Sequence, residues 1–210
     1  MTPDRSSHSF ASSSETQTAA VAAALGRLLL GGEVVALVGD LGAGKTRFVR
    51  GLAEGLGVPP DAITSPTFVI RHDHHGRRLD LSHLDAWRIG GHDDIESIGW
   101  DELLVRSDSV TAVEWAERLG DALPADALRV TIDHVGPTER AITLDGPGEI
   151  VDAWRKAIAE SPCRTCGRPT AFGSPDFPFC SARCRMADLG RWFAGEFRVS
   201  RPIGDDENAD

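Results

Sequence analysis

Two short clusters in this 210-residue chain combine residue types that bind anions or metal ions. The first is residues 39–46, whose letters GDLGAGKT match the pattern G-x-x-x-x-G-K-[ST] completely. Glycines let successive backbone N–H groups turn inward around phosphates, and a helix that follows adds its positive end. Lys45 would then reach the terminal phosphates, while Thr46 would offer a hydroxyl to Mg²⁺. The pattern predicts a P-loop that binds a nucleoside triphosphate with magnesium.

The lysine in this loop is unusual for the chain. Lys45 and Lys156 are its only lysines, and the remaining Lys and Arg positions are all arginine. A compact ammonium suits the loop, whereas a planar guanidinium would fit it badly. The alternative is a chance glycine-rich turn, which is disfavoured by the strand pattern before the loop and the helix pattern after it.

A P-loop also needs an acid near the magnesium and a group that positions the attacking water. Asp85 follows an apolar run in LSHLDAWR, and Glu114 ends the run SVTAVE. Each acid could instead be a solvated residue at the end of a strand. Ser65 and Thr67 flank Pro66 in the segment TSPTF, which is typical of a switch loop with hydroxyls near the phosphates. The alternative for this segment is a plain entrance to a strand.

The second cluster holds all four cysteines, with two residues between Cys163 and Cys166 and three residues between Cys180 and Cys184. Two such pairs can place four thiolates tetrahedrally around one Zn²⁺. A disulfide framework is the alternative, and a reducing compartment disfavours it. About forty residues bury too little apolar area to fold alone, so we expect the metal to supply much of the folding energy.

Alternating helical and strand patterns must position these groups. The sequence predicts helices over 15–30, 47–56, 95–105, 115–119 and 149–160 and strands over 33–38, 67–71, 78–84, 109–114, 128–135 and 139–144. We therefore expect an α/β fold: a P-loop NTPase-like sheet with flanking helices, plus a small C-terminal zinc ribbon or knuckle. The predicted organisation is a disordered serine-rich segment 1–14, an ATPase domain 15–160, a zinc domain 161–202 and a disordered acidic tail 203–210.

Charge and hydropathy restrict the partners of the chain. The net charge is −10, and residues 1–160 carry 15 Lys and Arg against 25 Asp and Glu. Phosphate backbones need clustered basic side chains, so we expect proteins as partners and no direct sequence-specific contact with nucleic acid from this part. No apolar run approaches the roughly 18 residues that cross a bilayer, and no secretory signal is evident. We expect a cytoplasmic protein that does not span a membrane.

Four ordered motifs, GDLGAGKT, SPTF, HLDAWR and VEWAE, together resemble the bacterial TsaE (YjeE) family over residues 10–160. That family is the ATPase of the threonylcarbamoyladenosine tRNA-modification system. The resemblance implies partnership with the TsaB and TsaD proteins, which carry the transfer chemistry, while the ATPase drives or resets the complex.

The resemblance also implies roles for single residues. It implies that Lys45 and Asp85 are catalytic, that Thr46 and Glu114 hold Mg²⁺, that Trp115 packs near the nucleotide, and that the phosphates of ATP lie on Gly42, Ala43, Gly44, Lys45 and Thr46. Arg47 replaces a threonine that is common after GKT, and Trp87 replaces a common tyrosine. We include Arg47 among the ATP-binding residues, with a solvent-facing side chain as the alternative.

The segments PCRTCGRP and FPFCSARCRMADLGRW resemble the YacG family of small zinc proteins over residues 162–202. That family binds the B subunit of DNA gyrase and inhibits the enzyme, so the resemblance implies gyrase B as a further partner. Leu189, Trp192 and Phe193 could form a partner face, or they could pack over the zinc ion.

Three functions follow from these patterns. The first is an ATPase for threonylcarbamoyladenosine modification of tRNA with an appended zinc module. The second is a P-loop kinase of a small metabolite, which is disfavoured because no arginine-rich lid is evident. The third is a regulatory protein that acts chiefly by binding gyrase.

Overall fold

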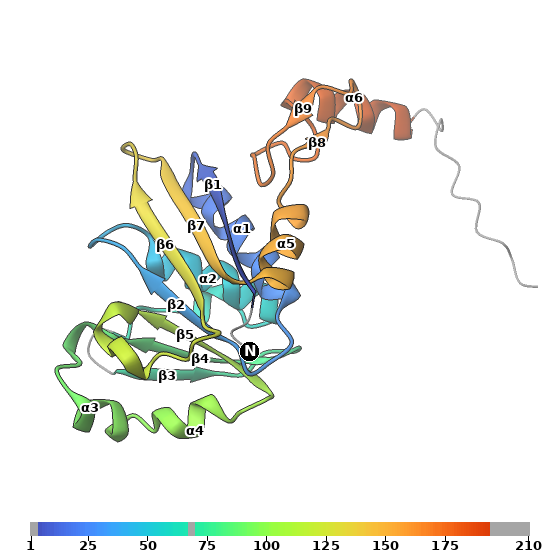
Figure 1. Ribbon diagram of the computed structural model, residues 1–210. Coiled ribbons are helices and arrows are strands. Elements are labelled where there is room, and N and C mark those ends of the chain that lie inside the picture. The colour runs from blue at the N-terminus through green and yellow to red at the C-terminus, as the bar shows by residue number, and fades with distance from the viewer. Residues whose placement is uncertain (1–3, 67–69, 194–210) are drawn as a thin grey trace, which may run out of the picture. The chain divides into compact units, whose positions relative to one another are not determined.

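The computed structural model describes residues 4–66 and 70–193 (Figure 1). The chain divides into two compact units, the first made of residues 1–159 and 172–175 and the second of residues 160–171 and 176–210. Residues 172–175, predicted as part of the zinc domain, group with the first unit. One reason is that Gln17 Nε2 donates a hydrogen bond of 2.7 Å to the carbonyl of Phe172.

The first unit is built on a sheet whose described strands run in the order β1-β7-β6-β2-β5-β4-β3. The central strands β6, β2, β5 and β4 are parallel neighbours, and the pairs at both edges are antiparallel. The carboxyl ends of β2, β4 and β5 therefore meet at one edge of the sheet. The strands are β1 (Arg5–Ser12), β2 (Val34–Val38), β3 (Arg71–His74), β4 (Asp80–Asp85), β5 (Ser109–Glu114), β6 (Leu128–His134) and β7 (Arg140–Pro147).

Helices cover both faces of this sheet (Figure 1). On one face, α1 (Glu15–Leu28), α2 (Lys45–Leu56) and α5 (Gly148–Ala157) bury side chains such as Leu25, Phe48 and Trp154. On the other face lie α3 (His92–Ser97), α4 (Trp100–Leu104) and the 3₁₀ helix η3 (Ala116–Ala122), with Trp100 and Leu103 in the core. Both faces of the parallel strands are covered, which explains the continuous apolar runs of β2 and β5.

Small residues bring α1 and α2 unusually close together. A Cβ atom on Gly55 would lie 2.4 Å from the carbonyl oxygen of Ala23, and one on Gly51 would lie 2.3 Å from that of Ala19. Real Cβ atoms do not approach backbone oxygen this closely, so only glycine fits at these two positions. We refer to Ala19, Ala23, Gly51 and Gly55 as the α1–α2 seam.

The predicted disorder of residues 1–14 is wrong for Arg5–Ser12, which forms strand β1. It pairs antiparallel with β7 along its whole length, from Arg5 opposite Pro147 to Ser12 opposite Arg140. Its inward face includes Phe10, which packs against the core, and an ion pair joins Arg5 to Asp145. Ser14 then caps α1 by accepting a hydrogen bond of 3.2 Å from the backbone N–H of Gln17.

The other differences from the predicted elements are local. The predicted helix 95–105 is divided into α3 and α4, because Gly99 has a φ of +69° and ends the helical path. The predicted strand 67–71 differs from the observed one. Strand β3 begins at Arg71, and residues 67–69 lie outside the described part of the chain. The predicted strand 109–114 is confirmed without change. The helix expected over 47–56 begins two residues earlier, at Lys45.

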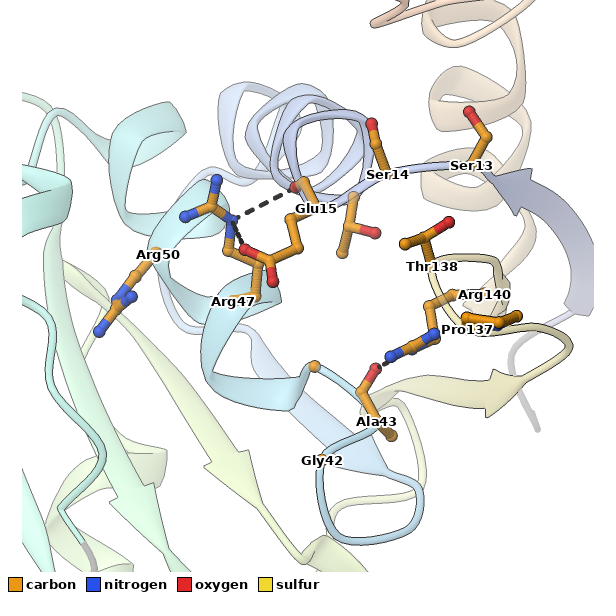
Figure 2. A pocket seen from close by; sticks show the side chains of 12 residues that line it. Ser13, Ser14, Glu15, Gly42, Ala43, Arg47, Arg50, Pro137, Thr138 and Arg140 are labelled. Carbon is orange, nitrogen blue, oxygen red and sulfur yellow. Dashed lines mark hydrogen bonds and ion pairs between the residues drawn. The ribbon is translucent and has the colours of Figure 1, made fainter.

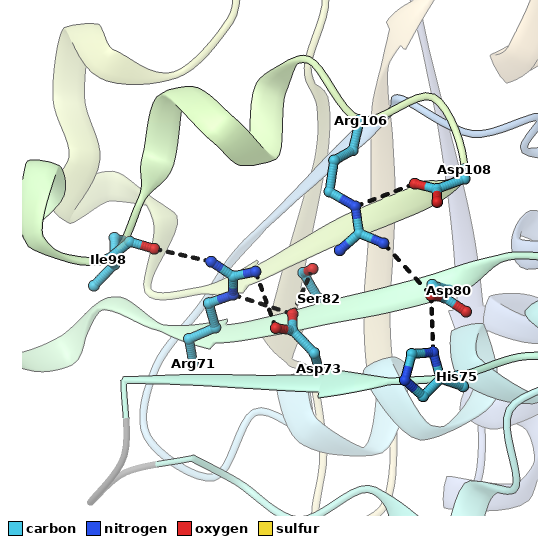
Figure 3. A network of polar contacts seen from close by, with 8 residues as sticks. All are labelled: Arg71, Asp73, His75, Asp80, Ser82, Ile98, Arg106 and Asp108. Atoms are coloured by element: carbon cyan, nitrogen blue, oxygen red, sulfur yellow. Dashed lines mark hydrogen bonds and ion pairs between the residues drawn. The ribbon is translucent and has the colours of Figure 1, made fainter.

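A network of charged side chains fastens β3, β4 and the segment after α3 to one another (Figure 3). Arg71 donates 3.1 Å hydrogen bonds to the carbonyl of Ile98 and to Asp73, and Ser82 donates a 2.7 Å bond to the same carboxylate. In the same network, Arg106 lies 3.4 Å from Asp80. These contacts hold the edge of the sheet against the helices on its second face.

The second unit is small and contains the four cysteines. A two-stranded sheet joins β8 (Ser161–Pro162) to β9 (Pro169–Thr170), and α6 spans Ala182–Phe193. Residues 194–202 of the predicted zinc domain and the predicted tail 203–210 lie outside the described residues. Within the described ranges, no helix combines the length and the apolar character that a membrane span requires.

Candidate functional site

The loop of residues 39–46 joins the end of β2 to the start of α2. Gly42 has a φ of +75° and Gly44 a φ of +106°, a left-handed region that favours glycine. Gly44 is the N-cap of α2, so the helix begins at Lys45 with its free N–H groups next to the loop. The strand, loop and helix therefore stand in the order that the sequence motif predicts.

Lys45 folds back onto its own loop. Its Nζ donates hydrogen bonds of 2.6 Å to the carbonyl of Gly39 and 2.9 Å to that of Asp40. The same atom lies 3.5 Å from the centre of the Trp115 ring. Burial lowers the pKa of this ammonium, although the nearby carboxylates of Glu114 and other acids act to raise it. The charge is thus held by carbonyl dipoles, by an aromatic face and by surrounding acids.

Glu114 connects the loop to the sheet behind it. Thr46 Oγ1 donates a 2.9 Å hydrogen bond to Glu114 Oε2, and His83 Nε2 lies 2.9 Å from the other carboxylate oxygen, Oε1. Glu114 is 3% exposed and His83 is fully buried. Hydroxyl and carboxylate oxygens are the ligands that Mg²⁺ prefers, so Thr46 and Glu114 fit that ion.

Asp85 lies beside Glu114, in register with it across β4 and β5. Its Oδ1 accepts a 2.9 Å hydrogen bond from the backbone N–H of Trp87, and its Oδ2 is 3.4 Å from the hydroxyl of Ser65. Ser65 therefore reaches the acid that the sequence placed in the site. Thr67, the other predicted switch residue, lies outside the described residues.

Trp115 follows Glu114 in a conformation that is uncommon for a large residue, with a φ of +58°. This left-handed backbone costs about 1–2 kcal/mol in an L-residue other than glycine. It places the Trp115 ring against that of Trp87, with ring centres 4.6 Å apart. Arg118 then lies over the Trp87 ring at 5.3 Å. Strain of this kind is concentrated at functional sites.

These side chains meet around a pocket of about 270 Å³. It brings together most of the residues predicted to bind ATP and Mg²⁺. Ala43 lines a neighbouring pocket instead, and Thr67 lies outside the described residues. The lining residues are Leu41, Gly42, Gly44, Lys45, Thr46, Arg47, Ser65, Asp85, Trp87, Glu114 and Trp115.

A second pocket, of about 390 Å³, shares Gly42, Gly44 and Arg47 with the first. Figure 2 shows Glu15 and Arg47 on one side of it and Thr138 and Arg140 on the other. Arg47 Nε lies 3.3 Å from the carbonyl of Glu15, and Arg140 Nε donates a 2.9 Å hydrogen bond to the carbonyl of Ala43. The remaining lining residues are Ser13, Ser14, Thr18, Ala43, Arg50 and Pro137.

From the sequence, the position of His83 before Leu84 and Asp85 favoured a structural role, whereas Arg140 and the serines at the start of α1 were missed. His83 precedes Asp85 by two positions in a strand, and side chains two apart share a face of the sheet. That spacing indicates that His83 lies on the same face as Asp85, and the structure places His83 in contact with Glu114. Arg140 carries no comparable signal, because it reaches the loop from a strand 97 positions further along the chain.

The four cysteines of the second unit form a separate metal site. Their Sγ atoms all lie within 4.8 Å of one another, with distances of 3.5 Å from Cys166 to Cys180, 3.6 Å from Cys180 to Cys184 and 3.7 Å from Cys184 to Cys166. Tetrahedral Zn²⁺ with Zn–S bonds of about 2.3 Å needs sulfur atoms roughly 3.8 Å apart. The four thiols therefore fit Zn²⁺ as they stand.

Arg168 supports this site from its rim. Its Nε lies 3.5 Å from Cys166 Sγ, and this hydrogen bond is the main reason that the pKa of the Cys166 thiol is lowered to about 6. A thiolate, not a thiol, is the ligand that zinc needs. Arg168 therefore favours the metal-binding form of Cys166.

Two family models match separate parts of the chain. Residues 12–142 match threonylcarbamoyl adenosine biosynthesis protein TsaE, and residues 161–210 match DNA gyrase inhibitor YacG. The chain is 48% identical over 132 residues to the tRNA threonylcarbamoyladenosine biosynthesis protein TsaE of Streptomyces coelicolor, covering 60% of this chain and 87% of that protein. It is 39% identical over 132 residues to the protein of the same name from Bacillus subtilis, covering 63% and 81%.

The fold gives the same result. The crystal structure of YdiB from Bacillus subtilis matches with a TM-score of 0.57 and 31% identity, covering 73% of this chain and 94% of that one. Both resemblances found in the sequence are confirmed, and the chain belongs to the TsaE family, with a YacG domain joined to its carboxyl end.

Proposed function

We propose that the first unit binds ATP with Mg²⁺ and hydrolyses it in support of threonylcarbamoyladenosine formation on tRNA. One observation carries the proposal: Lys45, Thr46, Asp85 and Glu114 converge on one pocket from the carboxyl ends of three neighbouring strands. Open α/β sheets bind their ligands at this edge. A lysine, a hydroxyl and two acids are the groups that phosphoryl transfer to water requires.

In this proposal the two connected pockets divide the nucleotide between them. The smaller pocket takes the β- and γ-phosphates, which the free N–H groups of the loop and the positive end of α2 stabilise. The larger pocket takes the nucleoside, between the start of α1 and Arg140. Lys45 must leave the carbonyls of Gly39 and Asp40 to reach the phosphates.

Thr46 and Glu114 would hold Mg²⁺, which neutralises charge on the phosphates when it is bound. Asp85 lies beside them and would orient the attacking water or a water ligand of the ion. Ser65 reaches the Asp85 carboxylate and would link it to the switch segment. Trp115 bounds the pocket and keeps bulk water from the Lys45 ammonium.

The biological role rests on the relatives, which are named tRNA threonylcarbamoyladenosine biosynthesis proteins. We propose that this chain acts in the same pathway in the cytoplasm, together with the TsaB and TsaD proteins. The acidic surface of the first unit supports protein partners over direct tRNA binding.

ATP hydrolysis by the purified full chain tests the proposal. Lys45→Ala should lower turnover by about 10²-fold or more, because a charge aimed at the phosphates is lost. Lys156→Ala is the matched control, since Lys156 is the other lysine and is exposed on α5. Equal turnover of both variants, or no ATP binding by the wild type with TsaB and TsaD present, would refute the assignment.

A second function is proposed for the second unit, namely binding of the DNA gyrase B subunit. The supporting observation is an exposed apolar face on α6, where Met186 and Trp192 are each 60% exposed and Phe193 is 74% exposed. Their exposure to solvent favours the partner-face alternative. A pull-down of gyrase B with Trp192→Ala, compared with Arg183→Ala on the same helix, tests this role. Unchanged binding by Trp192→Ala argues against it.

A further inference from the structure

We infer that His83 is a positioning residue that holds the Glu114 carboxylate in the orientation that binds Mg²⁺. This inference rests on the proposed function, since it concerns the magnesium site formed by Thr46 and Glu114. The main evidence is that both oxygens of the Glu114 carboxylate have a partner. His83 Nε2 lies 2.9 Å from Glu114 Oε1, and Thr46 Oγ1 lies 2.9 Å from Glu114 Oε2.

The sheet register places His83 under the site. His83 and Asp85 are two residues apart on β4 and so point to the same face, and Asp85 is paired with Glu114 on β5. His83 therefore lies one step deeper than the two acids, on the face covered by α2. Its side chain is fully buried, and the side chain of Glu114 is only 4% exposed.

The contact fixes the form of the imidazole ring. A carboxylate can only accept a hydrogen bond, so Nε2 must carry the proton that faces Glu114. In the described part of the chain, the other ring nitrogen of His83, Nδ1, is buried and has no hydrogen-bond partner. Glu114 is thus the one described group that compensates for burying this ring, and the imidazole is aimed at it.

A purely structural role explains this arrangement less well. A buried polar ring with a single satisfied nitrogen costs more than an apolar side chain of similar size. The His83 ring donates a hydrogen bond to one carboxylate oxygen of Glu114. This bond fixes the Glu114 rotamer and leaves Oε2 facing Thr46 and the pocket. Hydrogen-bond partners of metal ligands have this effect, and their removal typically weakens metal binding by about 10–100-fold.

Four variants separate the roles. His83→Leu removes the donor and keeps an apolar core, His83→Asn shortens the side chain so that its amide falls short of Glu114, and His83→Gln places an amide N–H near the position of Nε2. The matched control is His75→Leu, because His75 also pairs with a carboxylate, that of Asp80 at 3.0 Å, but its ring is 91% exposed. Circular dichroism and thermal unfolding report whether each variant is folded.

The measurement is the affinity for a non-hydrolysable ATP analogue, determined by calorimetry on the full chain with Mg²⁺ and with EDTA. We expect His83→Leu and His83→Asn to lose about 10-fold or more of the enhancement by Mg²⁺, with affinity in EDTA unchanged. His83→Gln and His75→Leu should keep most of it. If His83→Leu does not fold, the comparison of His83→Asn with His83→Gln still tests whether the hydrogen bond to Glu114 is needed for the enhancement by Mg²⁺.

Two results overturn the inference, and they differ in what else they overturn. If the wild type shows a magnesium enhancement that the Leu and Asn variants keep, or if Asn and Gln behave alike, the positioning role of His83 is wrong and the ATPase assignment stands. If the wild type binds the analogue equally with Mg²⁺ and with EDTA, the magnesium site itself is wrong, and the role of His83 falls with it.

Discussion

The Nζ atom of Lys45 lies 3.5 Å from the centre of the Trp115 ring while it donates to two carbonyls of its own loop. A cation over an indole face is worth about 0.5–2 kcal/mol. Binding of a triphosphate would therefore move the Lys45 ammonium from these partners to the phosphates. The environment of the Trp115 indole ring would change as the cation moves.

Tryptophan fluorescence should report this change. We expect ATP with Mg²⁺ to alter the emission of the wild type, because the cation moves relative to the Trp115 ring. Trp115→Phe should remove most of the signal, whereas Trp192→Phe, a substitution at an exposed ring of α6, should leave it intact. A signal that survives Trp115→Phe but disappears in Trp192→Phe would contradict the predicted movement of Lys45.

The α1–α2 seam should not tolerate a methyl group. Gly55→Ala places a Cβ atom 2.4 Å from a backbone oxygen, and overpacking of this kind typically costs about 1–3 kcal/mol. Helix propensity alone would favour alanine by about 1 kcal/mol, so the sign of the effect is informative. Gly190→Ala on α6 is the control, because its Cβ atom meets no heavy atom of the described residues within 4 Å. Thermal unfolding should show a loss for Gly55→Ala and none for Gly190→Ala.

Acid should remove a contribution of Asp73 to stability. Burial alone would raise the pKa of Asp73, but hydrogen bonds from Arg71 and Ser82 outweigh it and the pKa is lowered. A carboxyl whose pKa is lower in the folded state stabilises the protein above its unfolded pKa of about 4 and loses that contribution as pH falls below it.

Urea unfolding of wild type and Asp73→Asn at a series of pH values tests this dependence. The wild type should be the more stable at pH 7, and the difference should shrink as pH falls below about 4. Asp121→Asn, at an exposed acid of η3 outside the network of Figure 3, serves as control. A difference that stays constant or grows at low pH would contradict the argument.

Zinc removal should unfold the second unit and spare the first. Cys180→Ser removes one of four thiolates, and small metal sites of this kind depend on the metal for folding. We expect Cys180→Ser to lose bound zinc and its α6 to become open to proteolysis, while ATP binding by the first unit is retained. Ser181→Ala is the neighbouring control. Full zinc content in the Cys180 variant would rule out the four-thiolate site.

Much of the site could be predicted from sequence because its signals are local. The glycine-rich loop, the acids at strand ends and the paired cysteines each depend on short spacing, and each lies where that spacing placed it. Residues that reach the site from a distant strand gave no such signal. Arg140 contacts the carbonyl of Ala43 only because β7 runs beside β6, which is paired with β2.

The fold was predicted less well at its edges than at its centre. Serine-rich composition suggested disorder, but the alternation of Ser6, His8 and Phe10 on one face lets β1 pair with β7. Composition describes a segment on its own, whereas pairing depends on a partner more than a hundred residues away. The break at Gly99 is a backbone effect that apolar periodicity does not record.

The α1–α2 seam has a consequence for how the two pockets can change shape. Thr18 and Glu15 on α1 form a wall of the larger pocket, while Lys45 and Thr46 open α2 and face the smaller one. Backbones in direct contact leave no slack between these two helices. On the proposed function, a nucleotide would therefore bind against one rigid wall formed by α1 and α2. Any opening for its exchange would come from the opposite side of the pockets, where side chains from separate strands and turns line them.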